Sequence, residues 1–153
     1  MILNIELKQA CHKTCETLIA ERISTARSSM EEAQKAANEE VKSSAGDKYE
    51  TGRAMLQIER DKHALQLSEA LQLKAILDQL NPKQTQTTVT TGTLVSCSMG
   101  YFYISVSAGK MQVMGKTIFA ISIASPLGQA LKGKEAGDQF SFNGKTIQVT
   151  DVL

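Results

Sequence analysis

The sequence lacks several features that would assign a function at once. It has no tryptophan, aromatic residues make up only 5% of it, and its three cysteines are an odd number. So few cysteines do not build a disulfide framework. No apolar stretch is long enough for a signal peptide or a membrane span. We therefore expect a cytoplasmic protein with no membrane association.

The sequence also lacks an excess of charge of one sign. The first 80 residues hold 11 Lys and Arg against 13 Asp and Glu, and the remaining residues hold 6 against 3. A nucleic-acid-binding domain would concentrate basic residues on one face, and neither half has such an excess. Sequence-specific DNA binding is therefore not expected.

Proline, glycine and aromatic residues are scarce in the first half only. Residues 1–80 hold no proline, two glycines and one aromatic, whereas residues 81–153 hold both prolines, eight glycines and six aromatics. Pro82 cannot continue a helix. We predict a helical hairpin over residues 1–80, a linker over 81–88 and a compact domain over 89–153.

In the first half, apolar residues recur every three or four positions, as on one face of a helix. A break at residues 43–50 favours an antiparallel hairpin, with a parallel dimer as the competing arrangement. We expect Cys11 and Cys15 to be small apolar members of the packing face, because His12 and the distant His63 do not complete the four ligands of a structural zinc site. The predicted packing positions are Cys11, Cys15, Leu18, Arg22, Ala26, Met30, Ala33, Ala37 and Val41 in the first helix, and Leu56, His63, Leu67, Ala70, Leu73, Leu77 and Leu80 in the second, widened by Ile58, Leu65 and Ile76.

The second half reads as an antiparallel sheet with one short helix. Ser125 suits a helix N-cap, Pro126 the first helical position, and Gly133 the position just past the end. Asn143-Gly144 predicts a two-residue hairpin turn. The predicted strands, which are rich in β-branched and aromatic residues, are 89–97, 100–107, 111–114, 117–123, 140–142 and 145–152. The fold class is therefore α+β.

Residues 123–138, Ile-Ala-Ser-Pro-Leu-Gly-Gln-Ala-Leu-Lys-Gly-Lys-Glu-Ala-Gly-Asp, resemble the C-terminal signature of the bacterial transcript-cleavage factors GreA and GreB. That family combines an antiparallel helical hairpin with a small FKBP-like sheet domain, so the layout matches over nearly the whole chain. By this resemblance, Ser125, Pro126 and Leu127 would dock the protein on the rim of the secondary channel of RNA polymerase.

The resemblance also singles out Asp47 and Glu50, because the family carries its functional acids after a glycine at the same spacing. It implies that both acids enter the secondary channel near the 3′ end of backtracked RNA and help to hold a second Mg²⁺. Two carboxylates are an incomplete Mg²⁺ site, which polymerase acids would complete. The protein alone would then be neither an enzyme nor the holder of a cofactor. The simpler interpretation of Gly46-Asp47 is an ordinary solvated turn.

Residues 51–54, Thr-Gly-Arg-Ala, depart from the family pattern after the second acid. A secondary-channel factor that inhibits polymerase without stimulating cleavage is therefore the alternative function. Two other classes stay open. A peptidyl-prolyl isomerase would share an FKBP-like fold, although a sheet domain of this size without tryptophan offers a poor apolar pocket. An adaptor hairpin would make no catalytic contribution.

Overall fold

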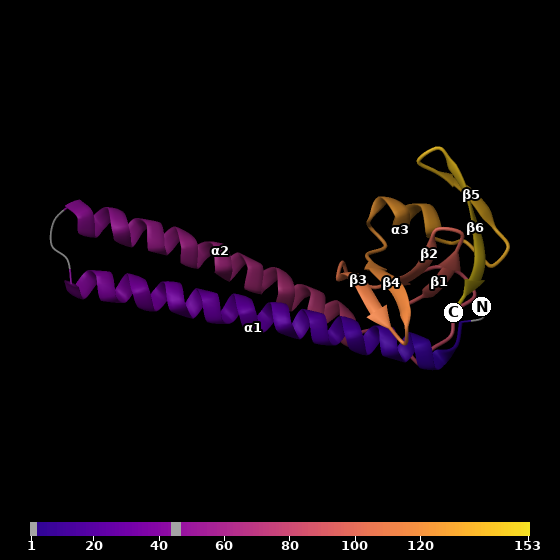
Figure 1. The fold of residues 1–153 in the computed structure, drawn as a ribbon, viewed down its shortest axis with the longest axis horizontal. Helices are drawn as coiled ribbons and strands as arrows, with labels where there is room; N and C mark the ends of the chain where they lie inside the picture. The colour runs from indigo at the N-terminus through magenta and orange to yellow at the C-terminus, as the bar shows by residue number, and fades with distance from the viewer. Residues whose placement is uncertain (1–2, 44–46) are drawn as a thin grey trace. The chain divides into compact units, whose positions relative to one another are not determined.

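The computed structural model describes residues 3–43 and 47–153, except for the side chains of residues 40–43 and 47–50. Two long helices precede six strands and one short helix (Figure 1), which confirms the predicted α+β class. Among the described residues, neither long helix has a stretch apolar enough to cross a lipid bilayer. The elements are α1 (Ile5–Ser43), α2 (Asp47–Asp78), β1 (Leu94–Cys97), β2 (Gly100–Ile104), β3 (Gly109–Val113), β4 (Lys116–Ile121), α3 (Pro126–Leu131), β5 (Gln139–Phe142) and β6 (Lys145–Val152).

The chain forms two compact units. The hairpin unit is Ile19–Lys74, and the sheet unit combines the residues up to Leu18 with Ala75–Leu153. The sheet unit therefore contains the start of α1, the end of α2 and all six strands. The predicted linker, residues 81–88, also lies within the sheet unit and has neither helix nor strand.

In the hairpin unit, α1 and α2 run side by side (Figure 1). Arg60 Nη1 of α2 donates a hydrogen bond to Gln34 Oε1 of α1 at 3.0 Å. The residues of α1 that this unit buries share one face: Ile19, Ile23, Ala26, Ala33 and Ala37. Three of these five residues are alanines, so the buried face of α1 carries mostly small side chains in this unit. The predicted antiparallel helices of more than about 25 residues are present, with 39 and 32 residues.

Several predicted packing positions were wrong. Arg22 is exposed, and its place on the buried face is taken by Ile19 and Ile23. Ile58 and Leu65 were expected to widen the packing stripe of α2, but both are exposed, as is Ile76 nearer the end of that helix. At about 100° per residue, Ile58 and Leu65 lie almost opposite the half-buried Leu67.

The six strands form a sheet in the order β3-β4-β2-β1-β6-β5. All neighbouring pairs are antiparallel except β2 and β4, which run parallel with Tyr101 opposite Ile118. The expected purely antiparallel sheet is corrected at this pair, because β3 intervenes in the chain and returns β4 alongside β2. Asn143 and Gly144, with φ of 50° and 78°, form the predicted hairpin turn between β5 and β6.

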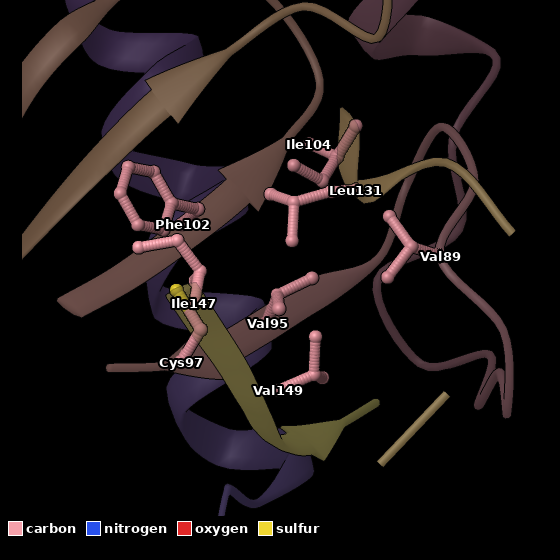
Figure 2. Close-up of a cluster of buried hydrophobic side chains, with 8 residues drawn as sticks. All are labelled: Val89, Val95, Cys97, Phe102, Ile104, Leu131, Ile147 and Val149. Atoms are coloured by element: carbon pink, nitrogen blue, oxygen red, sulfur yellow. The ribbon is translucent and has the colours of Figure 1, made fainter. Parts of the chain in front are cut away.

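The two faces of the sheet bury different partners. Side chains alternate along β2, so Phe102 and Ile104 face one side and Tyr103 the other. On the first side they belong to a cluster with Leu131 of α3, as Figure 2 shows. On the second side Tyr103 contacts His12 of α1. The first cluster comprises Val89, Val95, Cys97, Phe102, Ile104, Leu131, Ile147 and Val149.

Candidate functional site

The two acids predicted from the sequence lie in the first turn of α2. The helix begins at Asp47, so Asp47 and Glu50 follow the break between the helices and do not form it. Positions three residues apart share one side of a helix, and acidic residues are favoured at a helix N-terminus by the helix dipole. Their side chains lie outside the described part of the chain, so their predicted roles stay predictions.

The turn that carries the predicted docking residues is held by its own hydrogen bonds. Ser125 Oγ accepts a hydrogen bond from the Gly128 amide at 3.0 Å and donates one to the Ser122 carbonyl at 2.7 Å. Gln129 Nε2 donates to the Ile123 carbonyl at 2.8 Å. Ser125 is thus the N-cap of α3, as predicted, and the carbonyls of Ser122 and Ile123 in the loop before the helix both accept hydrogen bonds.

Gly128 is essential for this turn because no side chain fits there. A Cβ at this position would lie 2.2 Å from the Ser122 carbonyl oxygen and 2.8 Å from that of Ile123. Both contacts are with backbone, which cannot rotate away. Helix α3 therefore packs directly on the loop that precedes it, and the exposed Pro126 stands on a rigid support.

The three predicted docking residues differ in their exposure. Pro126 is exposed, Ser125 is partly buried as the cap, and Leu127 packs against the cluster drawn in Figure 2. The structure brings the three together at the start of α3. Of the three, Pro126 presents most of its surface to solvent, while Ser125 and Leu127 hold the turn in place.

Sequence reasoning missed the buried lysine Lys8 and a buried polar cluster, defined here as His12 and Cys15 of α1 with Tyr103 and Ser105. His12 Nδ1 lies 2.8 Å from the Tyr103 hydroxyl, and the two rings meet edge to face. Cys15 Sγ lies 3.8 Å from Ser105 Oγ. Lys8, His12 and Cys15 follow one another at four- and three-residue steps, which is the pattern that would have revealed a shared face.

Lys8, which lies one helical turn before His12 on α1, is fully buried. Its Nζ donates hydrogen bonds to the Gln84 carbonyl at 2.6 Å and to the Leu153 carbonyl at 2.7 Å. Burial lowers the pKa of Lys8 to about 8, because removal from water disfavours the ammonium form. These two hydrogen bonds connect α1 to the segments around Gln84 and Leu153, which are distant in sequence and lie in the sheet unit.

The cysteines behave as the small apolar residues that the sequence predicted for Cys11 and Cys15. Both are fully buried, and burial raises the pKa of Cys11 to about 12 and of Cys15 to about 11. Burial also raises the pKa of Cys97. A thiol that stays protonated is a poor nucleophile and a poor metal ligand. Among the described side chains, no three from His, Cys, Asp and Glu come close enough to hold a metal ion.

The buried His12 predicts a pH dependence of stability. Burial lowers the pKa of His12 from 6.5, against smaller opposing effects of Glu16 and Asp78. At a pH near 6 the unfolded chain then binds more protons than the folded protein, so the free energy of unfolding falls as the pH drops through about 6.5. His12→Asn keeps a polar atom near Tyr103 and removes this titration.

Urea unfolding at several pH values between about 5 and 8 measures that effect. The expected result is a smaller loss of stability on acidification in His12→Asn than in the original protein. If the free energy of unfolding falls equally with decreasing pH in both proteins, His12 is not held neutral by burial.

Comparisons with known proteins found little by sequence. No protein-family model matches the chain, and no curated protein matches it. Among solved structures, the transcription factor Gfh1 matches over 90% of this chain and 92% of that chain, with 19% sequence identity and a TM-score of 0.36.

Proposed function

We propose that this protein is a Gre-type transcription elongation factor that binds RNA polymerase. The proposal joins three features of one chain: a long antiparallel hairpin, two acids at its turn end, and the Ser-Pro motif of residues 123–138. In the proposed mode, the turn end of the hairpin enters the secondary channel while the start of α3 docks on the channel rim.

The docking part of this proposal rests on the well-defined turn at Ser125-Pro126. Ser125 caps the helix, Gly128 admits no side chain, and Pro126 remains exposed between them. A rigid exposed apolar residue costs little conformational entropy when it is covered by a partner. The contacts that shape the Ser125-Pro126 turn would therefore also hold Pro126 in position for binding to the polymerase.

In the proposed mechanism, Asp47 and Glu50 supply two carboxylates to a site that the polymerase completes. Carboxylate oxygens are suitable ligands for Mg²⁺, and one or two of them per protein are common. When bound, Mg²⁺ would activate the attacking water or stabilise the leaving oxygen in phosphodiester hydrolysis. The protein would act in trans on the cleavage activity of the polymerase and would have no activity of its own.

The alternative proposal is a secondary-channel factor that inhibits synthesis without stimulating cleavage. The observation that favours it is Gly52, which lies inside α2 within two residues of Glu50. A glycine inside a helix costs about 1 kcal/mol relative to alanine. A weakened first part of α2 would present the two acids less rigidly than cleavage requires.

The docking proposal is tested with Pro126→Asp. Aspartate is compatible with the first turn of a helix, so α3 should still form, but a carboxylate would be buried in the interface. We expect affinity for core RNA polymerase to fall by about tenfold or more. The measurement is equilibrium binding to core polymerase, for example by fluorescence anisotropy.

Asn143→Asp is the matched control for this variant. It adds the same charge at an exposed hairpin turn where aspartate is well tolerated. The control should bind as the original protein does. Unchanged affinity of Pro126→Asp would mean that the Ser-Pro turn serves only to begin α3.

A further inference from the structure

Helix α2 of the hairpin unit carries a second apolar stripe on its solvent side. Met55, Ile58 and Leu65 have exposed fractions of 66%, 69% and 61%. With Lys62 and Glu69, which are also exposed, they form a regular series of steps of three and four residues. This stripe is defined as Met55, Ile58, Lys62, Leu65 and Glu69.

The stripe lies on the side of α2 turned away from α1. The half-buried residues of α2, such as Leu56 and Leu67, face α1, and at about 100° per residue they are directed nearly opposite to Ile58 and Leu65. A surface helix normally has one apolar face. Alternating three- and four-residue steps are the pattern by which one helix packs along another.

The charges within the stripe indicate which occupant fits it. Lys62 and Glu69 lie symmetrically about the point between Leu65 and Gln66. If two copies of α2 meet antiparallel at that point, each Lys62 lies beside Glu69 of the other copy, and the two Leu65 side chains meet at the centre. A parallel pair would place Lys62 against Lys62 and Glu69 against Glu69, which is unfavourable.

We propose that the stripe is a self-association surface, on which a second copy of this chain packs antiparallel through α2. The interface is isologous, because the same residues contribute from both copies. Three apolar side chains and two charged stems per copy bury less than the roughly 1,200 Å² of a stable specific interface. The dimer is therefore weak and forms at high protein concentration.

Analytical ultracentrifugation of the whole protein over a wide concentration range tests this proposal. The original protein should show a reversible monomer–dimer equilibrium. Leu65→Glu, which places two carboxylates at the centre, should raise the dissociation constant by more than about tenfold. Leu71→Glu is the control, because Leu71 is an exposed leucine of the same helix that lies off the stripe; it should leave the equilibrium unchanged.

A charge exchange tests the antiparallel arrangement independently of folding. Lys62→Glu alone should weaken the dimer, and adding Glu69→Lys to it should restore the original affinity. The proposal is overturned if the protein stays monomeric at all concentrations. It is also overturned if neither Leu65→Glu nor Lys62→Glu changes the dissociation constant of the dimer. A monomeric protein in which Leu65→Glu instead weakens binding to core RNA polymerase also overturns it and assigns the stripe to the polymerase.

Discussion

Gly128→Ala is expected to lower the free energy of unfolding of the sheet unit by about 3 kcal/mol. The added Cβ would lie 2.2 Å from the Ser122 carbonyl oxygen, so α3 must move away from the loop before it. That movement also breaks the hydrogen bond between the Gly128 amide and Ser125. Urea unfolding followed by tyrosine fluorescence measures the effect, since Tyr101 and Tyr103 both lie in β2.

Gly133→Ala is the control for this substitution. Gly133 has a φ of +78° and open space where a Cβ would go, so alanine there costs only backbone strain of about 1 kcal/mol. If Gly128→Ala costs no more than Gly133→Ala, the close contact between α3 and its preceding loop is not what holds the turn. If the turn docks on the polymerase as proposed, Gly128→Ala should also weaken polymerase binding, as is expected of Pro126→Asp.

Asp47→Asn and Glu50→Gln are expected to abolish stimulated RNA cleavage while leaving polymerase binding close to that of the original protein. Each substitution keeps the size of the side chain and removes a charge that would attract Mg²⁺. Mutation of a residue that only hydrogen-bonds a metal ligand typically lowers activity by about 10–100-fold, and loss of a ligand itself should lower it at least as much. The measurement is the rate of transcript shortening in backtracked elongation complexes, alongside the dissociation constant for core polymerase.

The Mg²⁺ dependence of the same assay distinguishes a weakened metal site from a misfolded turn end of the hairpin. Raising the Mg²⁺ concentration should partly restore cleavage by either variant, because mass action offsets weaker binding. If both variants equal the original protein in every polymerase assay, Asp47 and Glu50 form only a solvated turn.

Local signals in the sequence predicted the second half of the chain well. The cap at Ser125, the first helical position at Pro126 and the turn at Asn143-Gly144 depend on neighbouring residues only, and all three are present. The parallel pairing of β2 with β4 depends on how distant strands come together, so propensity and alternation could not reveal it.

The packing of the long helices was harder to predict because α2 has apolar residues on two sides. Periodicity grouped Ile58 and Leu65 with the residues that face α1, although the structure exposes both. Lys8 and His12 were missed for the opposite reason. A lysine and a histidine are expected at the surface, and only the carbonyls around Lys8 and the hydroxyl of Tyr103 explain their burial.

The most direct test of the proposed function is to add the purified protein to backtracked complexes of core RNA polymerase that carry RNA labelled at the 5′ end. A Gre-type factor should bind the polymerase and cause Mg²⁺-dependent shortening of the RNA from its 3′ end, and the protein alone should not cleave free RNA. Binding that slows RNA synthesis without shortening the RNA would favour the alternative function, a secondary-channel factor that inhibits the polymerase. Failure to bind core polymerase at all would contradict the account.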